Sequence, residues 1–239
     1  GFERGDPSSG IPNLRLAVPT ALQDVSARYE IPLGALDRET APDQEVPALG
    51  WARVSGRAGH GQAAVVLLND CKHGHALEGA TLRLNLLRSS YDPDYLPDVD
   101  RHLVQLTLLS PDPSVSDAEL SARAAAHEQP LLAIGTDVHE GPLPATQGLL
   151  TLTGAAVTLS GLKWAEAGEG LVVRLTNTGA EPATAKLTTT PALGAIVSAQ
   201  PIDLMERPDG DAVPAAAGEV SLTVPAGSLG SWLIQAATV

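Results

Sequence analysis

The chain has 239 residues and a formal net charge of −13, and 44% of its residues are hydrophobic whereas only 3% are aromatic. This length allows one large β domain or two smaller domains, in which aliphatic side chains must fill the interior. The negative charge argues against nucleic acid or a membrane surface as a partner, and no apolar run approaches the roughly 18 residues of a transmembrane helix.

Short aliphatic stretches separated by turn residues predict an all-β fold. One short helix is expected near residues 117–127, because Ser116 and Glu119 form an S-x-x-E capping box and Pro130 closes the segment. The expected strands, in chain order, are Leu14–Val18, Ser26–Ile31, Ala63–Leu68, Thr81–Leu87, Leu103–Leu109, Ala156–Leu162, Leu171–Thr176, Ala183–Thr188, Val220–Val224 and Ser231–Gln235.

Two of these strands flank a loop that contains the only cysteine and two of the six histidines. The run AAVVLLND (residues 63–70) is apolar on both faces, which indicates a strand buried from both sides. TLRLNLLR (residues 81–88) alternates, with Leu82, Leu84 and Leu86 on one face. We expect the two strands to pair, so that the loop forms a polar hairpin tip beside a cleft.

Asp70, Cys71, His73 and His75 lie within six positions of this loop. Their side chains are of the types that bind zinc, but a hairpin tip would not gather them, and Lys72 adds an unfavourable charge. Cys71 and His73 also suggest a thiol nucleophile with its base, which would need a lowered thiol pKa that adjacency does not establish. We favour a solvated hairpin tip or a cleft-edge loop over the zinc site, and a Cys71 that only packs beside the buried strand over the nucleophile.

The acidic segment DPDYLPDVD (residues 92–100) places oxygen donors at alternating positions, as calcium loops do. It lacks the central glycine and the terminal glutamate of an EF-hand, so a solvated loop is favoured here too. The sequence has no G-x-S-x-G, H-E-x-x-H or P-loop motif, and paired carboxylates for glycoside chemistry cannot be chosen without their separations in space. The residues by themselves predict no self-sufficient active site.

Turn formers dominate residues 130–148, which indicates a domain boundary, and we place the two domains at residues 1–147 and 148–239. In the second domain, SGLKW-AEAGEG-LVVRL predicts a hairpin, and the later strands complete a small sandwich. The loop-like start without methionine is typical of a piece of something longer. The single cysteine fits a reducing compartment, and we expect a cytoplasmic protein.

LLNDCKHGHALEGATLRLNLLRSS, followed by YDPD and an Asp-Arg-His, closely resembles the C-terminal region of family 38 glycoside hydrolases, the zinc-dependent α-mannosidases, in their bacterial and cytosolic branch. RYEIPLGALDRET, the helix followed by QPLLA, and VTLSGLKWAEAGEGLVVRLTNT with IDLMERP resemble further segments of that region in the same order. The resemblance covers essentially the whole chain from about Leu14 onward.

This resemblance implies part of a galactose-mutarotase-like supersandwich, followed by a small C-terminal β-sandwich. It also implies that the aspartate nucleophile and the zinc ligands of a retaining enzyme lie in an N-terminal catalytic domain, whose motifs do not occur here. We therefore expect no catalytic residue, no metal site and no cofactor in this chain, which should be inactive alone. The implied partners are the catalytic domain of the same polypeptide, an α-mannoside substrate and a second copy in a homo-oligomer.

Two residues are candidates for the substrate cleft. Arg88 matches a position where related mannosidases place an arginine near the sugar, and a guanidinium can hold a hydroxyl or a carboxylate bidentately. Asp70, in the preceding loop, is expected to orient it. The alternative is that Arg88 pairs with Asp92 or Asp94 on the surface.

Two other functions stay open. The domains could form an independent carbohydrate-binding module that uses Trp51, Trp164 or Trp232 for stacking, although Trp232 is expected in the core. They could also be purely structural, closing the cleft and mediating oligomer contacts.

Overall fold

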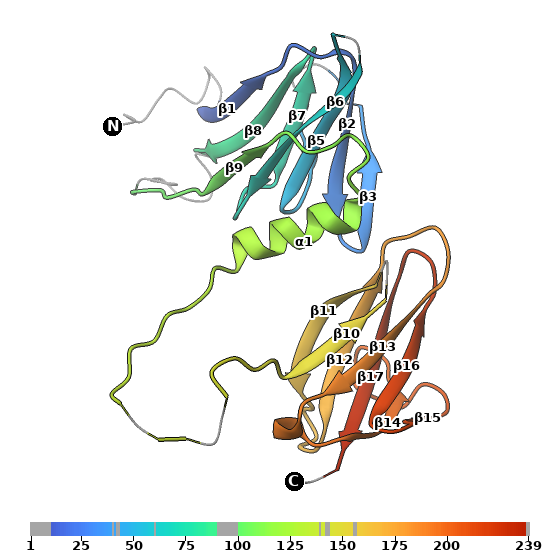
Figure 1. Cartoon of the computed structure of the whole chain (residues 1–239). Coiled ribbons are helices and arrows are strands. Elements are labelled where there is room, and N and C mark those ends of the chain that lie inside the picture. The colour runs from blue at the N-terminus through green and yellow to red at the C-terminus, as the bar shows by residue number, and fades with distance from the viewer. Residues whose placement is uncertain are drawn as a thin grey trace. The chain divides into compact units, whose positions relative to one another are not determined.

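The computed structural model describes residues 11–39, 41, 44–59, 61–89, 100–138, 140–141, 144–154 and 157–237. The chain divides into two compact units, Gly1–Leu131 and Leu132–Val239 (Figure 1). Both units are built of antiparallel β-sheets, and one α-helix belongs to the first, so the expected fold class is confirmed. The boundary expected at residues 147/148 stays a prediction.

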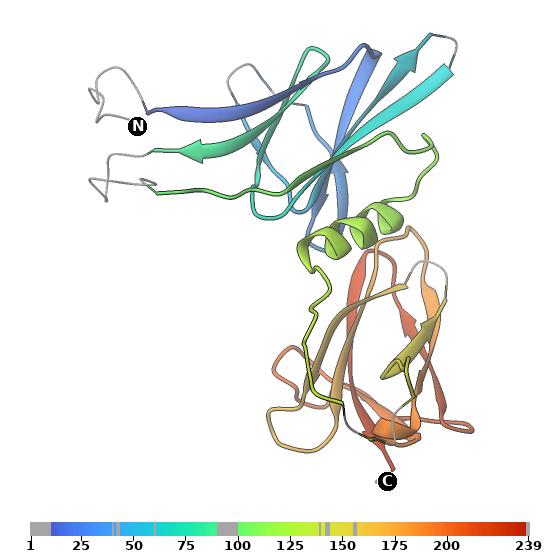
Figure 2. The same ribbon diagram turned by 60° about the vertical axis from the view of Figure 1, so that its left-hand side comes forward.

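The first unit is a sandwich of two sheets. The strands of the five-stranded sheet are, in spatial order, β3 (Gly34–Asp37), β2 (Gln23–Ile31), β5 (Trp51–Ala58), β6 (Gly61–Asn69) and β9 (Leu106–Leu109). Those of the four-stranded sheet are β1 (Asn13–Pro19), β8 (Thr81–Arg88), β7 (Gly74–Glu78) and β4 (Val46–Pro47). Figure 2 shows β1 and β8 running side by side. Alternating residues of both sheets form the core, including Tyr29, Val54, Leu67, Leu82 and Leu84.

The helix α1 (Asp117–Glu128) covers the outer face of the five-stranded sheet. Leu120 and Ala124 of α1 pack on Val66 and Leu68 of β6, while Leu67 points into the sandwich. The strand predicted from AAVVLLND is therefore buried from both sides, as expected. Within the described part of the chain, no helix has the length and apolar character that crossing a membrane requires.

The N-terminus of α1 forms only half of the expected capping box. The Ser116 hydroxyl accepts a hydrogen bond from the Glu119 backbone N–H at 3.2 Å. The Glu119 carboxylate instead accepts one from Arg123, a turn further along the helix, at 2.7 Å. The helix is tied to the sheet by Trp51, whose indole N–H donates to the Ser121 hydroxyl at 3.0 Å.

The expected pairing between the strands at residues 63–68 and 81–87 is wrong. β6 pairs with β5 and β9, whereas β8 pairs with β1 and β7 in the other sheet. After Asn69 the chain crosses between the sheets, and the true hairpin joins β7 to β8 through Gly79, whose φ is +58°. The sequence did not predict the extra strand β7, because GHALE is short and its histidine and glutamate interrupt the apolar pattern of a strand.

The second unit is also a sandwich of two sheets, which face each other across one core (Figure 2). The larger sheet contains β11 (Val157–Trp164), β12 (Leu171–Asn177), β17 (Ser228–Ala236), β14 (Ile196–Pro201) and β15 (Val213–Pro214). The smaller contains β10 (Leu150–Thr153), β13 (Ala183–Thr189) and β16 (Glu219–Val224). A short 3₁₀ turn, η2 (Pro191–Leu193), follows β13. The hairpin predicted from SGLKW-AEAGEG-LVVRL is confirmed as β11 and β12, and Trp232 lies in the core as expected.

Candidate functional site

The loop between β6 and β7 holds Asp70 firmly. One carboxylate oxygen of Asp70 accepts a hydrogen bond from the Cys71 thiol at 3.1 Å, and the other accepts one from the Gln105 backbone N–H at 3.1 Å. Burial acts to raise the pKa of Asp70, but these hydrogen bonds lower it overall. Partial burial and the neighbouring Asp70 raise the pKa of the exposed Cys71 thiol, which opposes its use as a nucleophile.

The two histidines of the loop have different surroundings. His73 lies with its ring nitrogen Nδ1 at 3.0 Å from the Ala48 carbonyl oxygen. His75 belongs to β7 and is fully buried against Tyr29 in the core. The solvated hairpin tip is therefore wrong for His75, because the chain has already entered the second sheet there. Among the described residues, no group of three or more His, Cys, Asp or Glu comes together as metal ligands would.

Arg88 is the last residue of β8, and it is exposed. It pairs across the sheet with Asn13 of β1. Its expected surface partners, Asp92 and Asp94, lie outside the described residues, as does most of the acidic segment 92–100. Asp70 follows β6 in the other sheet, and its described hydrogen bonds go to Cys71 and Gln105 rather than to Arg88. The cleft role of Asp70 and Arg88 stays a prediction.

A hollow of about 390 Å³ does lie beside this loop. His73 lines it together with mostly apolar residues that include Ile31, Pro32 and Leu49. Neither Asp70 nor Arg88 is among its lining residues. The loop therefore borders a depression, but the side chains chosen from the sequence do not face into it.

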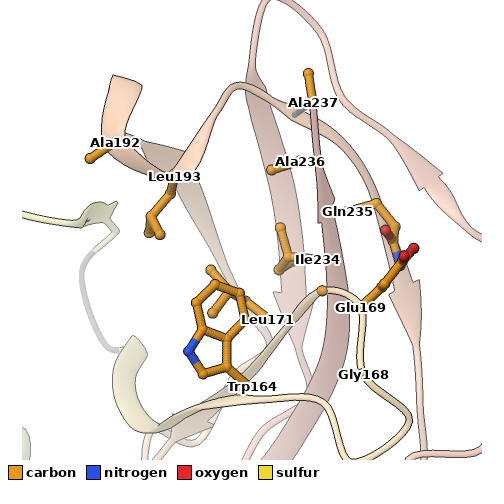
Figure 3. A pocket seen from close by; sticks show the side chains of 11 residues that line it. Trp164, Gly168, Glu169, Leu171, Ala192, Leu193, Ile234, Gln235, Ala236 and Ala237 are labelled. Atoms are coloured by element: carbon orange, nitrogen blue, oxygen red, sulfur yellow. The ribbon is translucent and has the colours of Figure 1, made fainter. Parts of the chain in front are cut away.

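The second unit has a larger hollow of about 460 Å³ at one end of its sandwich, which we call the Trp164 pocket (Figure 3). Its main side chains are those of Trp164, Glu169, Leu171, Leu193, Ile234 and Gln235. Leu171 and Ile234 belong to the hydrophobic core, so the core itself forms the floor of the pocket. Glu169 and Gln235 lie together on the side opposite Leu193 (Figure 3).

Trp164 stands at the end of β11, directly opposite Leu171 of β12. Because paired residues of an antiparallel ladder point to the same face, the indole lies on the core side of the sheet. It is nevertheless 65% exposed, whereas Trp51 and Trp232 are 0% and 7% exposed. Trp164 is thus the tryptophan of this chain that is open to a ligand.

Two glycines bring the walls of the Trp164 pocket together. Gly170 has a φ of +103°, and a Cβ there would lie 2.9 Å from the Ile234 carbonyl oxygen and 3.2 Å from Nε2 of Gln235. Gly194 has a φ of +75°, and a Cβ there would overlap the Ala237 carbonyl oxygen. Only glycine allows these backbones to approach so closely. Gly170 thus lets the β11–β12 hairpin pack closely against β17, and Gly194 lets the segment after η2 pack closely against Ala237.

A charged clamp holds the same hairpin from its other side. The Lys163 ammonium group donates hydrogen bonds to the Glu166 carboxylate at 2.5 Å and to the Glu206 carboxylate at 2.6 Å. Glu206 also accepts a hydrogen bond from the Glu166 backbone N–H at 2.8 Å. Glu206 adopts a φ of +62°, which is uncommon for a residue with a side chain. The turn that carries Glu169 is consequently fixed from two directions.

The sequence singled out Trp164 for stacking but not the groups around it. Glu169 could have been found, because glycines on both sides of it mark the tip of a predicted hairpin. Gln235 and Leu193 carry no such signal, since they reach the pocket only through the pairing of β17 with β12 and the turn η2.

Comparison with known proteins covers both units. Residues 11–96 match the glycosyl hydrolases family 38 C-terminal domain, and residues 156–226 match the glycosyl hydrolases family 38 C-terminal β-sandwich domain. Alpha-mannosidase 2C1 of Homo sapiens is 34% identical over 173 residues, which cover 68% of this chain and 16% of that protein. Alpha-mannosidase 2C1 of Mus musculus is 31% identical over 161 residues, which cover 64% of this chain and 15% of that protein.

Solved structures agree on the fold. A glycosyl hydrolase family 38 protein from Enterococcus faecalis has a TM-score of 0.67 at 18% identity, covering 93% of this chain and 26% of its own. An alpha-mannosidase from Enterococcus faecalis gives the same TM-score at 16% identity, with the same coverage of both chains. Two consecutive family domains, relatives above 30% identity and the shared fold agree, so the chain belongs to the C-terminal region of glycosyl hydrolase family 38.

Proposed function

We propose that this chain is the C-terminal β region of a zinc-dependent retaining α-mannosidase that hydrolyses terminal α-mannosides. The observation that carries the proposal is the match of two consecutive C-terminal family domains, together with relatives named as alpha-mannosidases. The chain spans 16% of the length of the human relative, and a catalytic domain elsewhere in the same polypeptide is part of the proposal. The proposal also includes a second copy of the protein as a partner and the cytoplasm as its location.

The proposal assigns the zinc and the nucleophile to that catalytic domain. Structural and catalytic zinc sites need three or four converging His, Cys, Asp or Glu side chains, and the described residues bring no such group together. Cys71 and His75, the nearest candidates, lie on the surface and in the core respectively. The described side chains therefore do not fit a zinc site.

Within this role, Arg88 and Asp70 are proposed to border the sugar cleft of the intact enzyme. Arg88 ends a strand whose preceding residues Leu82 and Leu84 lie in the core, and Arg88 itself is exposed. Asp70 is held in a defined orientation by its two hydrogen bonds. Support therefore lies in the positions of both residues at the ends of core strands.

The test compares the 239-residue chain with the whole polypeptide on an aryl α-mannoside, with zinc measured in both preparations. The proposal predicts turnover and bound zinc in the whole polypeptide alone. Turnover by the 239-residue chain would overturn the assignment of the reaction to another domain. A whole polypeptide that is folded, contains zinc and leaves every α-mannoside intact would overturn the proposed activity.

A further inference from the structure

The segment that follows α1 exposes much more apolar surface than a linker usually does. Four aliphatic side chains there are each at least 86% exposed, namely those of Leu131, Leu132, Ile134 and Val138. Linkers between compact units are typically polar or rich in glycine and proline, whereas exposed aliphatic side chains that gather in one place mark a site of interaction. We call residues 131–138 the apolar linker.

Neither compact unit uses the apolar linker for its own core. The three hydrophobic clusters of the described chain contain none of its side chains. The segment runs as extended chain without secondary structure (Figure 1), and no backbone–backbone hydrogen bond joins it to another described residue. Because backbone N–H and C=O groups bond strongly wherever they leave water, the apolar linker can offer both to a partner.

The order of the side chains in the apolar linker fits a β-strand. Successive residues of a strand point to opposite faces, so Leu132, Ile134 and Val138 would share one face with Thr136. Three of these four residues are β-branched, which is the type that strands favour. The opposite face carries alanine, glycine and aspartate after Leu131. As a strand, the segment would therefore have one strongly apolar face.

A segment of this kind suits the open edge of another sheet. When an extended segment is added to such an edge, its main chain supplies the hydrogen bonds and its alternate side chains enter the apolar surface of that sheet. The apolar linker has both parts of this contact, an unpaired main chain and aliphatic side chains at alternate positions. The kind of partner it fits is consequently a protein sheet with an exposed edge strand.

The extent of the contact indicates a partner within the same polypeptide. The apolar linker is far shorter than the roughly 20–30 residues a side of a stable interface between separate proteins. A covalent connection raises the effective concentration of the partner, so that a short strand is sufficient. This chain spans 16% of the human relative and 26% of the solved family 38 chain. Most of such a polypeptide is thus available to supply the partner sheet.

Charge disfavours a second copy of the chain as the partner. Each copy has a formal net charge of −13, so two copies repel each other. If two apolar linkers paired, Asp137 of each copy would also lie within the short ladder that they form. Like charges on neighbouring strands are destabilising.

We propose that residues 131–138 form a strand that pairs with an open sheet edge in the remainder of the longer polypeptide, with Leu132, Ile134 and Val138 packed on that sheet. The existence of this remainder rests on the proposed function. The inference goes beyond that function by naming the docking segment of this chain, the face that is buried and the kind of surface that receives it.

The test measures amide hydrogen exchange in the 239-residue chain and in the whole polypeptide. In the 239-residue chain, we expect the apolar linker to exchange at about the rate of an unfolded peptide. In the whole polypeptide, about half of its amides should exchange at least about 100-fold more slowly, because alternate N–H groups of an added strand point to its partner.

Two substitutions of equal charge distinguish the two faces of the proposed strand. Ile134→Asp places a carboxylate on the packed face and should abolish the slow exchange in the whole polypeptide. Ala133→Asp is the matched control on the opposite face and should retain it. Both positions lie outside the cores, so the melting temperature of the 239-residue chain should not change in either variant. A lower melting temperature with Ile134→Asp would show a partner within this chain and overturn the proposal.

Other results would also overturn the proposal. One is fast exchange of residues 131–138 in a folded whole polypeptide, and another is equal loss of slow exchange in both variants. A third is slow exchange in the 239-residue chain under conditions where sedimentation shows a dimer that Ile134→Asp dissociates, which would assign the strand to a second copy.

An α-mannoside assay on the same samples keeps this inference apart from the proposed function. Slow exchange of residues 131–138 in a whole polypeptide without turnover would refute only the proposed activity. Turnover by a whole polypeptide in which these residues exchange fast would refute only the proposed strand.

Discussion

His75 packs against Tyr29 in the core of the first unit, with ring centroids 6.0 Å apart and ring planes inclined by 58°. Both side chains are fully buried. Burial lowers the pKa of His75 to about 4, although a backbone group of Lys72 favours the charged form. Burial likewise raises the pKa of Tyr29 to about 12. The two rings therefore join the sheets as a neutral pair at neutral pH.

The first prediction is a loss of stability in mild acid that comes from His75. Its folded pKa of about 4 lies below the ordinary value of 6.5, so the unfolded chain takes up a proton before the folded one does. The contribution of neutral His75 to the free energy of unfolding is therefore fully present above pH 6.5, and it is lost as the pH falls toward 4. The shift corresponds to about 3 kcal/mol in the free energy of unfolding, to be measured by urea unfolding across this pH range.

Two variants isolate this effect from the titration of the carboxylates. His75→Leu keeps an apolar side chain in the core and should remove most of the loss between pH 6.5 and 4. His73→Gln, two residues away at the loop, should retain it. An acid dependence that is the same in His75→Leu and the unchanged chain would contradict the assignment to His75.

The second prediction compares two glycines of one turn. Gly168 and Gly170 both have a positive φ, of +109° and +103°, but a Cβ at Gly168 would meet nothing within 4 Å. A Cβ at Gly170 would lie 2.9 Å from the Ile234 carbonyl oxygen. Gly168→Ala should cost about 1 kcal/mol of backbone strain, and Gly170→Ala about 3 kcal/mol because strain and overlap add. Thermal unfolding of both variants checks the difference, which equal melting temperatures would refute.

The third prediction concerns the ion pair between Arg28 of β2 and Asp117 of α1, which ties the helix to the five-stranded sheet. Asp117 accepts hydrogen bonds from Nε and Nη2 of Arg28 at 2.9 and 2.8 Å, and both side chains are largely shielded from solvent. Asp117→Asn keeps the shape but loses the charge, and it should lower the free energy of unfolding by about 2 kcal/mol. Glu119→Gln disturbs only an exposed pair with Arg123 and should change it by less than about 0.5 kcal/mol. Urea unfolding distinguishes the two.

The fourth prediction tests the proposed cleft role of Arg88 in the intact enzyme. Arg88→Ala should lower kcat/KM for an aryl α-mannoside by about tenfold or more, because a charged hydrogen bond to the substrate is lost. Arg88→Lys should restore little of it if the contact is bidentate. Arg57→Ala is the control, since this exposed arginine pairs with Asp24 in the same sheet sandwich. An unchanged kcat/KM in Arg88→Ala would remove Arg88 from the cleft.

The sequence predicted strands where the apolar pattern was strong and missed them where it was weak. TLRLNLLR and SGLKW-AEAGEG-LVVRL alternate or end in clear turns, and both form the strands expected. The strand Trp51–Ala58 escaped because WARVSGRA carries two arginines and a glycine among its apolar residues. Its neighbours explain the glycine, since a Cβ at Gly56 would lie 2.7 Å from the Gln23 carbonyl oxygen.

Strand pairing was harder to predict than strand position. The residues of β6 and β8 do not by themselves indicate that these strands belong to different sheets. The difference arises after β6, where the chain passes from one sheet to the other at Asn69. The Asn69 amide donates to the Leu49 carbonyl at 2.9 Å, and its oxygen accepts from the Lys72 backbone N–H at 2.6 Å. The same limit applies to the Trp164 pocket, whose walls come from three separate parts of the second unit.

The proposed α-mannosidase role is tested by reconstituting the activity from two pieces. The 239-residue chain and the remainder of the proposed longer polypeptide are expressed together, with an affinity tag on the chain alone, and the purified material is assayed on an aryl α-mannoside. We expect the remainder to copurify with the chain and the complex to be active, whereas the chain alone is inactive. A chain that copurifies with nothing, beside a remainder that is fully active without it, would contradict the proposed role of this chain in the enzyme.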